Sequence, residues 1–167
     1  MSKILKEDKG VLVTLENGSV RKTVRGQNHS RFSGNVFPKE MVDREIRALK
    51  ILESVEGVQR FAGRESTETF YTKYMEGNSL KEFKRNLNNS YFDELAIIVR
   101  KCQERGVYRI GQAKLDFIVQ PNGKPGIIDF GNILFYDDYY AKFPGTISAS
   151  KFYNNLRVWD LRRRHTP

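Results

Sequence analysis

The stretch Ile127-Ile128-Asp129-Phe130-Gly131 decides the fold prediction, because a carboxylate follows two β-branched residues and precedes a turn-forming glycine. The two β-branched residues favour a buried strand, and the glycine lets the chain turn away where the strand ends. The carboxylate of Asp129 would then hold a fixed position and offer the hard oxygen that Mg²⁺ prefers. A carboxylate that merely ends a strand is the alternative interpretation, since Asp-Phe-Gly also occurs by chance.

The flanking sequence predicts a hairpin between helices. Residues 115–119 and 126–131 are typical of paired strands, joined by a turn at residues 121–125. A helix is expected before the hairpin over residues 92–105, with Gly106 at its C-terminal end. A last helix is expected from Ala149 to about Arg163, where helical steps separate Phe152, Leu156, Trp159 and Arg163.

The first part of the chain predicts a small antiparallel sheet. Residues 11–16 and 19–24 flank Asn17-Gly18, which favours a two-residue hairpin turn, and residues 3–6 predict one more strand. Residues 26–35 are rich in Gly, Asn, Ser and Gln, and predict a loop with little to bury.

A helix and two more strands are expected after this loop. The helix begins at Pro38 and ends before Gly57, with Met41, Ile46, Leu49 and Leu52 near helical spacing. Residues 58–61 and 69–74 predict the strands.

Composition limits the class of protein. The chain has 167 residues, of which 39% are hydrophobic and 12% aromatic, enough for one core or a small two-lobed body but not for a multidomain machine. The 29 Lys and Arg against 20 Asp and Glu give a net charge of +9, which favours anionic partners such as phosphates, nucleic acid, acidic proteins or membrane headgroups. One cysteine, Cys102, excludes an internal disulfide and a multi-cysteine zinc site. With no apolar run near ~20 residues and no signal-peptide pattern, a cytoplasmic protein is expected.

Five features in a fixed order carry a family resemblance. They are Val20-Arg21-Lys22, Glu45, residues 74–80, residues 106–119, and Asp129-Phe130-Gly131. In this order the sequence resembles the protein kinase-like superfamily, especially its small atypical bacterial members, the lipopolysaccharide-core sugar kinases and the RIO-type kinases. The resemblance covers nearly the whole chain.

The resemblance implies an α+β, minimal two-lobed kinase-like fold. Residues 1–77 would form an N-lobe with an antiparallel sheet and one helix, and residues 78–167 a truncated, mainly helical C-lobe. Mg-ATP would bind between the lobes. Transfer of its γ-phosphoryl group to a hydroxyl on a protein or a lipopolysaccharide-type sugar would be the activity.

The resemblance also implies roles for residues that contact phosphate and metal. Lys22 would contact the α/β-phosphates and pair with Glu45, with Arg21 as the cation if the strand register differs. Asp129 would hold Mg²⁺, and the spacing 129 − 116 = 13 places Asp116 where such kinases usually carry an Asn that holds the second metal. Ordinary surface roles for these side chains, with Lys22 pointing outward and Glu45 solvating its helix, are the alternative.

Two further sets of residues follow from the same resemblance. Tyr74, Met75 and Glu76 would lie at a hinge that faces adenine, and simple packing is the alternative for Met75. Asp160 would brace the catalytic loop, whereas pairing with Arg157 or Arg164 is its alternative.

Two departures from the family pattern leave the activity open. The turn that should be glycine-rich reads Glu7-Asp8-Lys9-Gly10, and Gly111 stands where the family carries its catalytic Asp. Lys114 or Arg109 could neutralise a transferring phosphoryl group. The competing function is a pseudokinase that acts as a nucleotide-binding or scaffold protein.

Other chemistries have less support. His29 and His165 have no second ligand at zinc spacing. The cations are dispersed rather than gathered with aromatics, so a nucleic-acid partner is disfavoured. The basic run Arg162-Arg163-Arg164-His165 suggests contact with anionic lipid, which would place the protein at the inner face of a membrane, or with nucleic acid. The alternative is a basic helix end that is only solvated and compensates the helix dipole.

Overall fold

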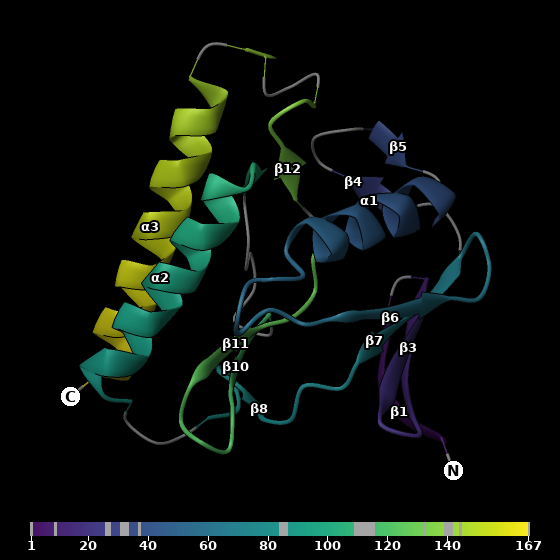
Figure 1. Cartoon of the computed structure of the whole chain (residues 1–167), viewed down its shortest axis with the longest axis horizontal. Helices are drawn as coiled ribbons and strands as arrows, with labels where there is room; N and C mark the ends of the chain where they lie inside the picture. The colour runs from purple at the N-terminus through teal and green to yellow at the C-terminus, as the bar shows by residue number, and fades with distance from the viewer. Residues whose placement is uncertain are drawn as a thin grey trace. The chain divides into compact units, whose positions relative to one another are not determined.

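The computed structural model describes residues 2–8, 10–25, 28–30, 34–36, 38–83, 87–108, 116–131, 133–138, 142–143 and 145–166 (Figure 1). The chain divides into two compact units. Unit 1 comprises Met1–Glu53 and Gln59–Tyr74, and unit 2 comprises Ser54–Val58 and Met75–Pro167. The second unit therefore includes a short segment from the first half of the chain.

Unit 1 is built on a five-stranded antiparallel sheet with the order β1-β2-β3-β7-β6. Its strands are β1 (Ser2–Asp8), β2 (Val11–Glu16), β3 (Ser19–Val24), β6 (Phe61–Arg64) and β7 (Thr69–Lys73). Asn17 and Gly18 have φ angles of 48° and 76°, as a two-residue hairpin turn requires. The predicted β2–β3 hairpin is confirmed residue for residue.

One helix, α1 (Pro38–Ile51), contacts β3, β6 and β7 of this sheet. It buries Val42, Ile46 and Leu49, which recur at helical spacing and form one apolar stripe. The helix prediction is confirmed, with an end at Ile51. The strand predicted at residues 58–61 instead begins at Phe61.

The prediction of a loop over residues 26–35 is wrong in part. β4 (Asn28–Ser30) and β5 (Gly34–Val36) pair as a short antiparallel ladder. A two-stranded ladder is held by backbone hydrogen bonds, so its sequence need not alternate between apolar and polar residues. For that reason the composition did not reveal it.

Unit 2 contains two helices that lie side by side and run antiparallel (Figure 1). α2 (Asn89–Glu104) starts earlier than predicted because the Asn88 side chain accepts the Tyr91 N–H and caps the first turn. α3 (Thr146–His165) is longer than predicted. The direction follows from two contacts at one end of the pair: Arg162 binds the Asp93 carboxylate, and the Leu87 N–H donates to the carbonyl of His165.

Short strands complete unit 2. β10 (Phe117–Val119) pairs with β11 (Pro125–Ile127) on one side and β8 (Asn78–Ser79) on the other, while β9 (Val107–Tyr108) pairs with β12 (Leu134–Phe135). The β10–β11 pair confirms the predicted hairpin, although Leu115 lies outside the described residues. The fully buried large side chains of this unit include Tyr91, Phe92, Phe117, Phe130 and Phe135.

The architecture confirms the predicted α+β class. Its main sheet is antiparallel, and strands separate the three helices that the described residues form. Cys102 is buried in α2, and burial raises the pKa of its thiol to about 12. Within the described residues, no helix combines the length and the apolar character needed to cross a membrane.

Candidate functional site

Lys22 and Glu45 form a buried ion pair in unit 1. Lys22 Nζ donates to Glu45 Oε2 at 2.6 Å, and the two side chains are 14% and 6% exposed. Lys22 lies opposite Phe70 of β7, and Phe70 is fully buried. The pairing that the sequence resemblance implies is therefore present in the structure.

The packing of α1 explains why Glu45 needs this partner. Glu45 precedes the core residue Ile46 and lies on the side of α1 that is buried. Among the described residues, Glu45 is the only charged residue that is buried. A carboxylate removed from water is stable only when it is paired and hydrogen-bonded, and Lys22 provides both.

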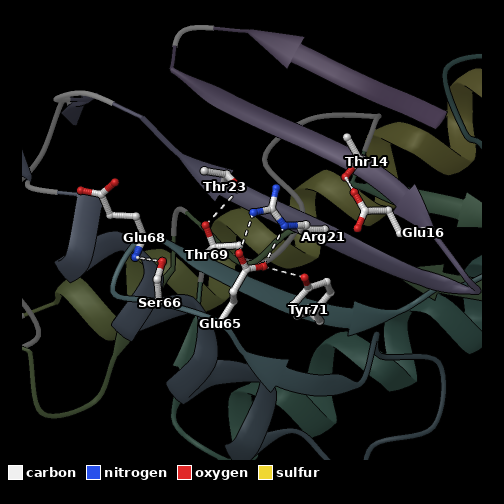
Figure 2. A network of polar contacts seen from close by, with 9 residues as sticks. All are labelled: Thr14, Glu16, Arg21, Thr23, Glu65, Ser66, Glu68, Thr69 and Tyr71. Carbon is white, nitrogen blue, oxygen red and sulfur yellow. Dashed lines mark hydrogen bonds and ion pairs between the residues drawn. The ribbon is translucent and has the colours of Figure 1, made fainter. Parts of the chain in front are cut away.

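Arg21, the residue before Lys22 in β3, belongs to a different network (Figure 2). Its Nε and Nη2 atoms each donate to the Glu65 carboxylate at 2.9 Å, and the Tyr71 hydroxyl donates to the same carboxylate at 2.6 Å. Neighbouring residues of a strand point to opposite faces, so the register selects Lys22 as the partner of Glu45. The alternative with Arg21 in that place does not occur.

Asp129 follows the β10–β11 hairpin of unit 2 in an unusual backbone conformation. Its φ angle is 64°, a value that Asp tolerates better than most residues. Its Oδ1 accepts the Gly131 N–H at 3.1 Å, which closes a side-chain turn of the kind that Asx residues form. The neighbouring Ile127 and Phe130 are fully buried, so the backbone on both sides of Asp129 is anchored in the core.

Asp116 belongs to the same end of this hairpin. The Ile128 N–H donates to the carbonyl of Asp116 at 2.8 Å, which extends the Phe117–Ile127 pairing by one residue. Asp116 therefore stands across from the residue that precedes Asp129.

The chemistry of these two carboxylates suits Mg²⁺. They are hard oxygen donors, and a magnesium ion that also binds phosphate and water needs only one or two carboxylates. No cluster of three or more His, Cys, Asp or Glu side chains that could hold a metal ion occurs in the described part of the chain.

The predicted hinge residues divide between the units. Tyr74 closes unit 1, where its N–H donates to the carbonyl of Gly18 at 3.1 Å, and its ring is exposed. Met75 and Glu76 belong to unit 2. A Cβ atom on Gly126 would lie 2.5 Å from Met75 Sδ, so this thioether packs on a glycine, whereas Glu76 is exposed. The packing role foreseen as the alternative for Met75 is thus observed.

Asp160 forms the ion pairs with arginines of its own helix that were given as the alternative to its bracing role. It pairs with Arg157 at 3.6 Å and with Arg164 at 2.9 Å, both on its own helix. The predicted bracing of a catalytic loop concerns residues 109–115, which include Arg109, Gly111 and Lys114 and lie outside the described residues. Lys9, in the turn that replaces the glycine-rich loop, also lies outside them.

The sequence analysis missed the partner of Arg21. Glu65 follows β6 in a segment that has no apolar periodicity, so hydrophobic patterning contains no information about it. Its contact with Arg21 joins residues 44 positions apart. The only available signal was the opposite charge of the two side chains.

Comparisons with known proteins find similarity in structure but not in sequence. No family model and no curated protein matches the chain. The crystal structure of the Rio2 kinase from Chaetomium thermophilum superposes with a TM-score of 0.69 at 12% identity, over 93% of this chain and 54% of that one. The Rio2 kinase-ADP/Mg²⁺-phosphoaspartate complex from the same organism gives a TM-score of 0.63 at 13% identity, over 92% and 50% of the two chains.

These matches establish the fold. The chain has a protein kinase-like fold, as the resemblance to RIO-type kinases implies, and it spans about half the length of the kinase chains that it matches. A specific likeness to lipopolysaccharide-core sugar kinases is not shown. Function has to be argued from the side chains.

Proposed function

We propose that this chain is a kinase-like phosphotransferase that binds Mg-ATP and transfers its γ-phosphoryl group to a hydroxyl. The observation that carries the proposal is the 2.6 Å contact between Lys22 Nζ and Glu45 Oε2 in a largely buried setting. A lysine ammonium held by a carboxylate is the arrangement that positions a cation for the α/β-phosphates in kinases.

The energetics of the pair support a functional role. A buried ion pair stabilises a fold little, because the desolvation of two charges offsets much of their attraction. Replacement of a buried ion pair by apolar side chains of similar volume is often neutral or even stabilising. The retention of charges at positions 22 and 45 is explained by a ligand of opposite charge to Lys22, such as a phosphate.

The acidic end of the β10–β11 hairpin would supply the metal ligands. The Asp129 side chain is held by its hydrogen bond from the Gly131 N–H. The backbone of Asp116 is held by the pairing of the same hairpin, in which its carbonyl accepts the Ile128 N–H. Bound magnesium would neutralise charge on the β- and γ-phosphates. The structural neighbour is known as an ADP/Mg²⁺-phosphoaspartate complex, which supports an adenine nucleotide and Mg²⁺ as the bound ligands proposed for this chain. The backbone of residues 74–76 is proposed to face the adenine ring.

A second candidate, a pseudokinase that binds nucleotide without transfer, rests on the residue at position 111. Gly111 has no side chain to accept a proton from the acceptor hydroxyl. Transfer of a phosphoryl group passes through a loose transition state, so positioning and electrostatics can sustain a rate without that base.

For the phosphotransferase, the proposed acceptor is a hydroxyl on a protein or on a lipopolysaccharide-type sugar.

Thermal unfolding with and without Mg-ATP tests the nucleotide site. A ligand at one hundred times its Kd stabilises the folded state by about 2.7 kcal/mol, so the wild-type Tm should rise. The rise should vanish in Lys22→Met and in Asp129→Asn, where Asn tolerates the same φ angle and can still accept the Gly131 N–H. Arg21→Met is the matched control and should keep the rise, because Arg21 binds Glu65 on the other face of the sheet.

Transfer of labelled phosphate then separates the two candidates. A wild-type protein that labels itself or an added acceptor is a phosphotransferase. Nucleotide-dependent stabilisation without transfer, together with transfer gained in Gly111→Asp, identifies a pseudokinase. If Mg-ATP leaves the wild-type Tm unchanged, or if the rise persists in Lys22→Met, the proposed site is wrong.

A further inference from the structure

We propose that the outer face of α3 binds the surface of an anionic lipid membrane. The face is formed by Phe152, Leu156, Trp159 and Arg163, here called the α3 stripe. This inference goes beyond the proposed phosphotransferase and does not depend on it. It rests on which face of α3 the fold buries and which it exposes.

The fold uses only one face of α3. Ser150, Asn154, Val158 and Leu161 are its buried residues, and α3 lies alongside α2 (Figure 1). The stripe lies on the opposite side of the helix, since its residues fall about half a turn away from the buried set. Packing within the described part of the chain therefore gives no reason for apolar side chains at the stripe.

The stripe nevertheless exposes three large apolar side chains. Phe152 is 68% exposed, Leu156 46% and Trp159 56%. Their spacing of four and three residues aligns them along one line of the helix, about 10 Å long. A line of large exposed apolar groups, unlike single scattered ones, marks a binding surface.

The helix that presents this line has a net positive charge. α3 carries five cations, at positions 151, 157, 162, 163 and 164, against the one carboxylate of Asp160, which gives 5 − 1 = +4 for the helix. Arg157 and Arg164 pair with Asp160, and Arg162 binds Asp93 of α2, which offsets part of this charge. The Arg163 guanidinium lies 5.4 Å from the centre of the Trp159 ring. An aromatic ring beside an arginine fits the boundary between acyl chains and headgroups, where the ring enters the apolar layer and the cation binds lipid phosphate.

An anionic membrane explains these features better than a nucleic acid does. Leu156 is in the middle of the stripe and has no π-face on which a base could stack. Arg163 covers one face of the Trp159 ring, which would obstruct stacking there. A lipid surface, in contrast, accepts aliphatic and aromatic groups alike.

A second copy of the chain fits the stripe poorly. Two helices of charge +4 repel each other when their stripes meet. Three side chains also provide much less area than the ~800 Å² per partner of a standard protein interface. The membrane is therefore the occupant to which the proposal commits.

The chain contains a single tryptophan, so Trp159 can report its own environment. The 167-residue chain is mixed, without nucleotide, with vesicles of phosphatidylcholine alone or of equal parts phosphatidylcholine and phosphatidylglycerol. We expect the Trp159 emission to shift to the blue with the anionic vesicles only, and to be quenched when the lipid chains are brominated. Added salt should weaken the binding, because it screens the cations.

Variants connect the binding to the stripe. The double variant Phe152→Ser/Leu156→Ser keeps the Trp159 reporter and should reduce partitioning into anionic vesicles by roughly tenfold or more. Arg163→Gln should reduce it less, while the control Ile97→Ala, which removes an exposed apolar side chain of α2, should leave it unchanged. Circular dichroism verifies that each variant keeps its helices.

Several results would overturn the proposal. These are an emission that does not respond to anionic vesicles, equal binding to both kinds of vesicle, or full binding by the double variant. A blue shift with single-stranded oligonucleotides but not with vesicles would assign the stripe to nucleic acid. A blue shift that depends on protein concentration alone would assign it to a second copy.

Discussion

Two neighbouring residues of β3 each form an ion pair, and the pairs differ in their contact with water. Lys22 and Glu45 are 14% and 6% exposed on the face covered by α1, whereas Arg21 and Glu65 are 25% and 42% exposed on the other face. The exposed pair has the better geometry, with two parallel bonds of 2.9 Å (Figure 2). The buried pair has a single bond of 2.6 Å.

The ion pair with the better hydrogen-bond geometry is therefore not the pair that indicates a function. Exposed pairs are screened by solvent and contribute little to stability, so Arg21–Glu65 is adequately explained as an ordinary surface ion pair. The buried pair costs desolvation that apolar residues would not incur. Its presence therefore points to a role other than stability.

The largest expected effect comes from Lys22→Met, which leaves the buried Glu45 without this cation. We expect the free energy of unfolding to fall by about 2–3 kcal/mol, at or just below the range for broken buried pairs, since Lys22 retains some access to water. Urea-induced unfolding measures this change.

The double variant Lys22→Met/Glu45→Leu is the control for that experiment. Because it removes both charges, it should recover most of the lost stability while still failing to bind nucleotide. If the double variant were less stable than Lys22→Met, the pair would be a structural necessity and the inference of function would fail.

Arg21→Met is expected to have a smaller effect. The charge that it leaves on Glu65 stays in contact with water, so the shift of the urea midpoint should be less than about a third of that in Lys22→Met. Added salt should erase most of this shift, because exposed charges are screened within a Debye length. A shift as large as that of Lys22→Met would mean that the two faces do not differ as we argue.

Sequence alone could predict the part of the fold that local chemistry determines. Asn17-Gly18 defines the β2–β3 hairpin and hence which of its side chains share a face. The pairing of Lys22 with Glu45 came instead from the family resemblance, because no local signal relates a residue of β3 to a residue of α1. β8, β9 and β12 were missed because strands of two residues have no periodicity to detect.

The face on which α3 packs could not be predicted from sequence. Both Phe152-Leu156-Trp159 and Val158-Leu161 follow helical spacing, and tertiary packing decides that the second set is buried. The same packing buries Ser150 and Asn154, which hydropathy places at the surface. The Asp129 backbone likewise depends on the tertiary anchoring of its neighbours rather than on a local signal.

The pH dependence of the exposed pair offers a sharper measurement than its total stability. Hydrogen bonds from Arg21 and Tyr71 lower the pKa of Glu65 from 4.5 to about 2. A depressed pKa in the folded state means that the stabilisation is complete above pH 4.5 and is lost as pH falls toward 2. The stability difference between wild type and Arg21→Met should therefore be constant near neutral pH and shrink in acid. A carboxyl NMR titration of Glu65 measures the pKa directly, and a value near 4.5 in the wild type would contradict the network.

The smallest expected effect comes from Tyr71→Phe, which removes one of the donors to Glu65 and keeps the ring. Since the Arg21 hydrogen bond is the larger cause of the shift, the pKa of Glu65 should rise only in part and stay below 4.5.

The hydrogen bond between Tyr71 and Glu65 also raises the pKa of Tyr71, because ionised Glu65 accepts the phenolic proton and disfavours its loss. A raised pKa in the folded state gives a stabilisation that is complete below pH 10 and is lost as pH rises through the folded value. The stability difference between wild type and Tyr71→Phe should thus be present at neutral pH and disappear in strong base. An unchanged Glu65 titration in Tyr71→Phe would show that Arg21 alone holds this carboxylate.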